Sequence, residues 1–416
     1  MKNKTLKSKK TSIILLCALV ASYAFACMTR NCFSSAMVFI VEEGYLTTFE
    51  TGIITAVFYL VYAALQVVGG IITDKWHPEH LLSVGLLGAG ICNLVIFFNQ
   101  SYPVMLTMWA LNAVVQLGVW PATFKLVSTM LHKDMRTSSL FIVTFSNPLG
   151  VVASYLVSSI VNTHWQLNFL ISAVGLLLLA PLFELVFHKI SKDIVEEEIE
   201  ISVDEKKTAK HKEKSFFSLM LSSGLIIILV ISLVRNGFDI GLKSITPVMI
   251  KESYSGVTPI LATLLNIIVL VAGALGTVLA YLIYPKILKN ESVIIAIFFT
   301  IALPLTIASL MLGKISYWWI IVIISLIVML MSATSLFTTS YVGTHFNKYG
   351  KGATVAGLLN CASALGIVVA NALFTGLSEK IGWYGVVVVW VATMSIATLL
   401  SLLVIPLWSR FIKNQA

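Results

Sequence analysis

The stretch HKISKDIVEEEIEISVDEKKTAKHKEKSF, residues 188–216, is the most polar part of an otherwise apolar chain. Of the 416 residues, 58% are hydrophobic and only 11% are charged, and the mean hydropathy is +0.94. A soluble chain is nearer half apolar and a quarter charged. The composition therefore excludes a soluble enzyme, a nucleic-acid-binding domain and a disordered protein. We interpret residues 188–216 as a solvated linker and expect it to be an inert tether between two apolar halves.

Apolar runs long enough to cross a bilayer, about 20 residues each, lie on both sides of this linker. Six precede it and six follow it, at residues 12–40, 51–73, 81–98, 103–131, 138–161, 166–187, 217–250, 257–284, 292–313, 317–345, 353–377 and 382–408. They lack the alternation of a membrane β-barrel strand. The predicted fold is an all-α membrane protein with twelve transmembrane helices. Two six-helix bundles, residues 1–187 and 217–416, flank a cytoplasmic linker at 188–216.

The N-terminal end has a second interpretation, a cleaved signal peptide over residues 1–27. No A-x-A cleavage site follows it, and the apolar run continues to Ile40, which favours a transmembrane helix.

The basic residues predict the orientation of the chain. With a cytoplasmic N-terminus, 21 of the 28 Lys and Arg residues fall on the cytoplasmic side, and only Lys251, Lys314 and Lys380 fall outside. By the positive-inside rule, both termini are then cytoplasmic. We expect a multi-pass protein of the cell membrane, and the Lys-rich composition favours a bacterial inner membrane.

Four cations remain inside the apolar spans, namely Arg30, Lys125, Arg235 and Lys243, against one well-placed acid, Asp239. An arginine at mid-bilayer costs about 2.5–3.5 kcal/mol by insertion scales, so it normally faces a bundle interior or a water-filled pathway. Its planar guanidinium matches phosphate or carboxylate groups in bidentate fashion. These residues are therefore candidates for an anion-binding site.

The two arginines occur in similar surroundings in the two halves. Thr29-Arg30-Asn31-Cys32-Phe33 matches Val234-Arg235-Asn236-Gly237-Phe238, and each stretch lies in the first span of its half. In a transporter built from two similar bundles, such helices line a central cavity, so both arginines are predicted to approach one substrate. The alternative is internal pairing: Arg235 and Asp239 are four residues apart and can neutralise each other, whereas Arg30 has no carboxylate within one turn.

The turn after the second span reads Gly69-Gly70-Ile71-Ile72-Thr73-Asp74-Lys75 and resembles the loop signature of the major facilitator superfamily. Its glycines allow close helix approach. The resemblance implies a gating loop with Gly70, Asp74 and Lys75. The second half keeps small residues at Gly276 and Ala280 but lacks the acid.

Within that superfamily the chain is similar to the organophosphate:phosphate antiporters, which include the glycerol-3-phosphate and hexose-phosphate transporters. The similarity is carried by Arg30-Asn31-Cys32-Phe33-Ser34-Ser35-Ala36-Met37, by Gly118-Val119-Trp120-Pro121 with Lys125, by Val234-Arg235-x-Gly237-x-Asp239 and by Gly382-Trp383-x-Gly385. It implies that Arg30 and Arg235 bind phosphate and that Tyr23 and Tyr62 line the cavity. The chain departs from the family at three positions, where Asn31, Gln66 and Ser146 replace basic residues or a histidine. It also has extra residues between Arg235 and Pro247.

The expected function is secondary transport of a small organic anion, a phosphorylated metabolite exchanged for inorganic phosphate by alternating access. The candidate substrate-binding residues are Arg30, Arg235, Lys125, Tyr62, Gln66, Tyr23, Asn31 and Asn147. Lys125 either extends the anion site or balances Asp239. Asp239 and Lys243 are candidates for a coupling ion pair, although we favour a Lys243 ammonium that reaches the membrane surface. For any single amide, a hydrogen bond to another helix is the more common role.

Two alternatives stay open: a proton-coupled symporter of sugar acids or other carboxylates, which would use Asp239, and a transporter-like sensor of phosphorylated sugars. The sequence contains no metal-ligand spacing and no phosphate-binding loop of an ATPase. We therefore expect no enzyme activity, cofactor, metal or nucleic-acid partner. The expected partners are the lipid bilayer and a small anionic substrate, and the expected state is a monomer.

Overall fold

The structure is a computed structural model that describes residues 2–162, 164–198, 216–283, 290–346, 349 and 351–413. Within these ranges it is helical apart from two short strands, which confirms the expected all-α membrane class. The contacts divide the chain into two compact units, Met1–Glu50 with Leu60–Val203 and Thr51–Tyr59 with Asp204–Ala416. Each unit holds an interior arginine, Arg30 or Arg235.

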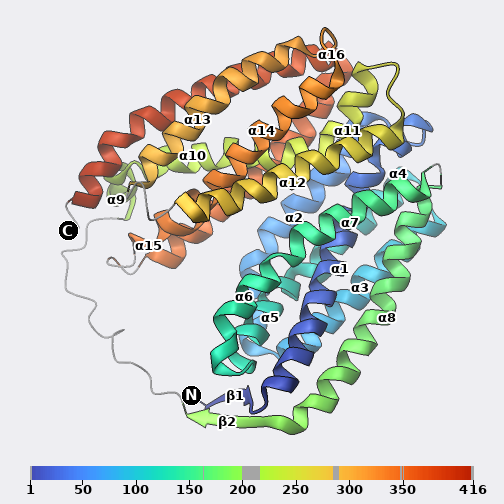
Figure 1. The fold of residues 1–416 in the computed structure, drawn as a ribbon, viewed down its shortest axis with the longest axis vertical. Coiled ribbons are helices and arrows are strands. Elements are labelled where there is room, and N and C mark those ends of the chain that lie inside the picture. Colours follow the sequence, from blue (N-terminus) through green and yellow to red (C-terminus); the bar gives the residue numbers. More distant parts are fainter. Residues whose placement is uncertain are drawn as a thin grey trace. The chain divides into compact units, whose positions relative to one another are not determined.

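The first unit is a bundle of long helices, shown in blue to green in Figure 1. They are α1 (Lys9–Glu42), α2 (Thr48–Lys75, of which Thr51–Tyr59 belongs to the second unit), α3 (Pro78–Phe98), α4 (Tyr102–Val115), α5 (Val119–Lys125), α6 (Arg136–Thr144), α7 (Ser146–Val161) and α8 (Gln166–Ile190). Helix α1 packs against α7 and α8, and α3 packs against α4 and α8. Leu19, Leu86 and Leu176, on α1, α3 and α8, are fully buried where these helices meet.

The start of α2 shows why the sequence begins a helix there. The Glu50 amide donates to the Thr47 hydroxyl at 3.1 Å, and the Thr47 amide donates to the Glu50 carboxylate at 2.8 Å. This reciprocal capping box satisfies two amides that have no partner inside the helix. The fourth predicted span is less regular, because a 3-10 turn at Gln116–Gly118 separates α4 from α5 and a π-helical turn at Leu126–Met130 follows.

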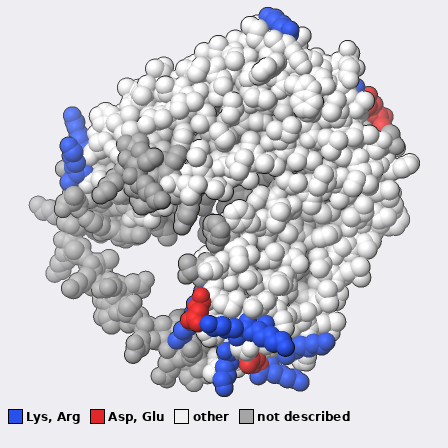
Figure 2. Space-filling model, viewed as in Figure 1, with Lys and Arg blue, Asp and Glu red and all other residues white. Residues whose placement is uncertain are grey.

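A two-stranded antiparallel sheet joins the N-terminus to the segment after α8. Strand β1 (Lys2–Leu6) pairs with β2 (Ile194–Glu198), with Leu6 opposite Ile194. The Asp193 carboxylate accepts hydrogen bonds from the Ser8 amide at 2.9 Å and the Thr11 hydroxyl at 2.5 Å. Figure 2 shows Lys and Arg side chains gathered at this end of the unit. The expectation of an inert tether is therefore wrong for residues 188–198, which form the end of α8, a turn and a paired strand; residues 199–215 lie outside the described ranges.

The second unit is also a helical bundle, shown mainly in yellow to red in Figure 1. It contains α9 (Phe216–Ser223), α10 (Leu225–Asn236), a π-helical turn (Gly237–Gly241), α11 (Leu242–Ser253), α12 (Pro259–Ile283), α13 (Glu291–Ala308), α14 (Tyr317–Leu336), a second π-helical turn (Phe337–Tyr341), α15 (Val342–Thr344) and α16 (Gly352–Lys413). Helix α10 packs on α16, and α12 packs on α14.

Eleven helices among the described residues are long and apolar enough to cross a membrane. Twelve apolar runs were predicted, and the difference lies in α16, which contains both runs 353–377 and 382–408. Its helical geometry is interrupted at Gly382, where φ is 70° and ψ is 169°. Only glycine adopts such a positive φ without strain, so this residue marks the kink between two helical segments.

Close backbone packing holds α10 against the first half of α16. A Cβ atom added at Gly366 would overlap the Leu233 carbonyl oxygen and would lie 2.8 Å from its carbon. One turn further along, a Cβ at Gly241 would lie 2.6 Å from the Ala370 Cβ. Small residues allow helices to approach closely in membranes, where packing rather than hydrophobic burial drives association.

Candidate functional site

In the first unit, Arg30 lies half-buried on α1 among polar side chains of two other helical segments. Its Nε donates to the Gln116 Oε1 at 3.2 Å, and its Nη1 lies 3.5 Å from the Tyr62 hydroxyl. The guanidinium carbon also lies 5.0 Å from the centre of the Tyr62 ring, within the range of a cation–π contact. The Gln116 amide in turn donates to Asn112 at 2.7 Å. These neutral groups orient the guanidinium in the interior of the unit.

The remaining candidates of the first unit take different positions. Tyr23 is buried and packs its ring against Trp120, with 4.9 Å between ring centres. Asn31 donates its amide to the Cys27 carbonyl of its own helix at 2.8 Å, and Asn147 is exposed on α7. The structure therefore brings Tyr62 to Arg30, whereas the amide donor of Asn31 is used within α1. The side chain of Gln66 lies outside the described residues.

The gating-loop candidates lie at the end of α2. Lys125 donates from its ammonium to the Thr73 carbonyl at 2.7 Å, so this lysine is tied to the last turns of α2. The close approach expected of the glycines occurs at Gly69, where an added Cβ would overlap the Leu117 carbonyl, whereas Gly70 has open space around it. Lys75 is exposed, and the side chain of Asp74 lies outside the described residues.

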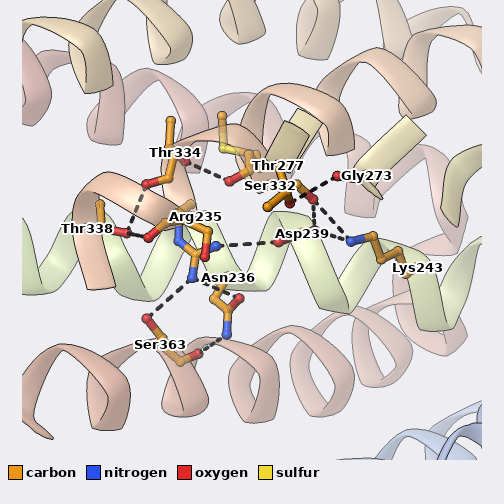
Figure 3. A network of polar contacts seen from close by, with 12 residues as sticks. Arg235, Asn236, Asp239, Lys243, Gly273, Thr277, Ser332, Thr334, Thr338 and Ser363 are labelled. Carbon is orange, nitrogen blue, oxygen red and sulfur yellow. Dashed lines mark hydrogen bonds and ion pairs between the residues drawn. The ribbon is translucent and has the colours of Figure 1, made fainter. Parts of the chain in front are cut away.

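In the second unit, Arg235 is the last-turn cation of α10, and only 2% of its side chain is exposed. Its Nη1 lies 3.4 Å from the Asp239 carboxylate, and its Nη2 donates to Asn236 at 3.0 Å and to Ser363 at 3.4 Å (Figure 3). Asn236 also donates to the Ser363 carbonyl at 2.8 Å, which fixes both residues against α16. The internal pairing considered for Arg235 and Asp239 is thus present in this structure.

Lys243 approaches the same carboxylate from the next turn, as Figure 3 shows. Its ammonium lies 2.5 Å from Asp239 Oδ1 and donates to the Ser332 hydroxyl at 3.1 Å. The Ser332 hydroxyl donates to Asp239 Oδ1 at 2.6 Å. The Lys243 ammonium therefore points into a polar network of the second unit. The expectation that it extends to the membrane surface is wrong for this structure.

Sequence reasoning identified Tyr62 and Asp239 but missed other polar residues around the two arginines. Gln116 and Asn112 are amides four residues apart in an apolar run, a spacing that puts them on one helix face and could have singled them out. Ser332 and Ser363 carried no such signal, because serines are common in packed membrane helices.

Long apolar helices with charged side chains buried among them are the architecture of a membrane transporter. The family model described as Major Facilitator Superfamily matches residues 19–370. The chain belongs to this superfamily, a family of transporters rather than of enzymes, and is a multi-pass membrane protein.

Its curated relatives are distant. The chain is 25% identical over 162 residues to the "Membrane sensor protein UhpC" of Salmonella typhimurium, covering 38% of this chain and 37% of the relative. It is 25% identical over 128 residues to the "Probable hexose phosphate transport protein" of Chlamydia trachomatis, covering 31% and 28%. The matches thus span no more than about two fifths of either chain. They confirm the resemblance to the organophosphate:phosphate antiporters.

Two solved structures show the same fold over nearly the whole chain. A bacterial homologue of the human lysosomal transporter Spinster aligns with a TM-score of 0.77 and 15% identity, covering 97% of this chain and 99% of that one. A peptide transporter in complex with sulfate aligns with a TM-score of 0.70 and 16% identity, covering 95% and 94%. At this identity the likeness concerns the fold alone.

Proposed function

We propose that the protein is a secondary transporter of a small organic anion, a phosphorylated metabolite that it exchanges for inorganic phosphate by alternating access. The observation that carries this proposal is an interior arginine in each unit, Arg30 and Arg235. Burying a guanidinium in apolar surroundings costs free energy, so an arginine in a membrane span normally marks a ligand site or a transport pathway. Its forked donors suit phosphate oxygens. The distant relatives described as hexose phosphate transport proteins support the same substrate class.

The proposal includes the setting of the protein. We place it in the bacterial plasma membrane as a monomer, with both termini on the cytoplasmic side. The distribution of Lys and Arg between alternate loops of the sequence supports this orientation of the termini.

The test is phosphate counterflow in proteoliposomes. The variants Arg30→Lys and Arg235→Lys keep the charge but remove the planar fork, so each should lower the initial rate by about tenfold or more, the value of one lost charge-assisted hydrogen bond. Arg410→Lys is the matched control, because Arg410 is exposed in the last turn of α16. Arginine variants that transport as well as this control would contradict the assignment.

A second candidate is proton-coupled symport of a carboxylate, favoured by one acid, Asp239, buried between two cations. Uptake driven by a pH gradient and lost in Asp239→Asn would support symport over exchange.

A third candidate is a sensor of phosphorylated sugars, favoured by the relative described as a membrane sensor. Saturable binding of glucose 6-phosphate without any flux would support this role.

A further inference from the structure

A groove of about 540 Å³ lies between α3 and α8 in the first unit. These two helices pack along each other (Figure 1), and the groove lies toward the end of the unit where α3 begins and α8 ends. Ligand sites are commonly about 300–1,000 Å³ in volume, so the groove is large enough to hold part of a small molecule. Its lining residues, taken from both helices, are Ser83, Leu87, Ala180, Pro181, Glu184, Leu185 and His188.

The groove opens on a lipid-facing side of α8. The side chains of Val174, Leu178, Leu182 and Leu185 are 46–65% exposed and recur every three or four residues, which places them on one face of the helix. All four are apolar, and α8 is long and apolar enough to span a membrane. Lipid tails are as apolar as leucine, so this face contacts acyl chains. Leu185 belongs both to this face and to the groove, and an acyl chain can therefore enter the groove from the surrounding lipid.

The end of the groove nearest the helix termini is polar. The Glu184 carboxylate lies 3.0 Å from the Nδ1 of His80, an exposed residue in the first turn of α3, and 34% of the Glu184 side chain is exposed. His188 lies one turn after Glu184, and it is exposed beside Lys189 in the last turn of α8. A carboxylate can accept several hydrogen bonds, so Glu184 can accept a further donor besides His80. This end thus presents an acid and, one turn further, basic side chains.

These charges distinguish among phospholipid headgroups. An anionic headgroup carries no cation to pair with the Glu184 carboxylate, which would repel its phosphate. A choline headgroup carries a cation, but its quaternary nitrogen has no N–H to donate. An ethanolamine headgroup carries a primary ammonium, with three N–H donors like that of lysine, and a phosphate that suits the basic side chains of His188 and Lys189. Ethanolamine therefore matches both the acid and the bases of the groove.

We propose that the groove between α3 and α8 is a phospholipid-binding site for a lipid with an ethanolamine headgroup. One acyl chain lies in the apolar part of the groove, and the ammonium of the headgroup donates to Glu184. The phosphate of the same headgroup lies at the basic end of α8, beside His188 and Lys189. The ligand is a lipid of the surrounding membrane, so this inference does not depend on which solute the protein transports.

The experiment titrates the purified full-length protein in detergent with three dioleoyl phospholipids, whose headgroups are ethanolamine, choline and glycerol. Native mass spectrometry measures how much lipid is bound. The wild type should bind the ethanolamine lipid about tenfold more tightly than the choline lipid, the effect of one charge-assisted hydrogen bond. Glu184→Gln should remove this preference. Glu79→Gln is the matched control, because the Glu79 carboxylate lies 3.1 Å from His77 and Glu79 is not among the residues that line the groove.

A second pair of variants tests the apolar part of the groove. Leu87→Trp enlarges a side chain that lines the groove, so it should weaken the binding of all three lipids. Ile91→Trp is the matched control, because Ile91 lies one turn further along α3, is 56% exposed and is not among the lining residues. It should bind the three lipids as the wild type does.

Three outcomes would overturn the proposal. The first is a wild-type protein that binds the three headgroups equally or prefers the glycerol lipid, which is the result expected if basic side chains attract any anionic lipid. The second is a preference for ethanolamine that Glu184→Gln and Glu79→Gln retain alike. The third is unchanged lipid binding in Leu87→Trp, and this variant decides if Glu184→Gln does not fold, as judged by thermal unfolding.

Discussion

The contact between Gly366 and Leu233 gives a sharp prediction for Gly366→Ala. The added Cβ would overlap the Leu233 carbonyl oxygen and approach its carbon to 2.8 Å and its Cα to 3.1 Å. These are backbone atoms, so no side-chain rotation relieves the overlap and the helices must separate. Overpacking of this kind costs about 1–3 kcal/mol.

Gly357→Ala provides the matched comparison on the same helix. No heavy atom lies within 4 Å of a Cβ at Gly357, so this variant receives only the helix-propensity gain of about 1 kcal/mol that both substitutions share. The difference between the variants therefore isolates the overlap. At about 2–4 °C per kcal/mol for a unit of roughly 200 residues, Gly366→Ala should melt about 2–12 °C below Gly357→Ala.

The assay is thermal unfolding of the two purified variants in the same detergent, followed by counterflow. Ser363 lies one turn before Gly366 and bonds both Arg235 and Asn236, so Gly366→Ala should also transport more slowly. Equal melting temperatures for the two variants would refute the close packing of α10 on α16.

Three further predictions concern single contacts. Gln116→Leu removes an acceptor of the Arg30 Nε. Loss of this charged hydrogen bond should lower the free energy of unfolding by about 1.5–3 kcal/mol and slow counterflow. An unchanged melting temperature and an unchanged transport rate would contradict this prediction. Glu291→Ala leaves the Trp408 indole N–H, now 3.1 Å from that carboxylate, buried without its acceptor; thermal unfolding should show a loss of about 1–3 kcal/mol. The ammonium of Lys9, 2.8 Å from Asp134, holds the pKa of that carboxyl below its usual value. This ion pair therefore stabilises the fold at pH values above the usual pKa of aspartate, and the contribution is lost as the pH falls through the lowered pKa. Asp134→Asn should therefore melt slightly below wild type at pH 7 and low salt, and the gap should close at acidic pH or in 1 M salt.

The fold class could be predicted from the sequence because the apolar runs are long enough to cross a membrane and because Lys and Arg concentrate in alternate loops between them. It also identified Arg30 and Arg235, since a charge inside an apolar run is visible without any structure. Their distant hydrogen-bond partners could not be predicted: Gln116 lies 86 residues from Arg30, and Ser363 lies 128 residues from Arg235. Which amide or hydroxyl contacts an arginine depends on how the helices pack, and local sequence patterns do not predict that packing.

The direction of Lys243 shows a different limit. A lysine late in a span often extends to the membrane surface, although Asp239, four residues earlier, offered an ion pair as the alternative. The structure keeps it inside because Gly273, on another helix, leaves space for the ammonium. The lack of a side chain at Gly273 thus helps to determine where the Lys243 side chain lies.

The strand pairing of β1 with β2 also has a consequence in time. Leu6 lies opposite Ile194, so the ribosome must make about 190 residues after the first strand before its partner exists. At about 5–20 residues per second, this interval lasts roughly 10–40 s. Throughout it the backbone of the first strand has no sheet partner, while the helices from α1 to α8 enter the bilayer. The pairing can therefore form only after the whole first unit has been synthesised, and a chain truncated at the end of α8 would emerge with its N-terminal strand unpaired.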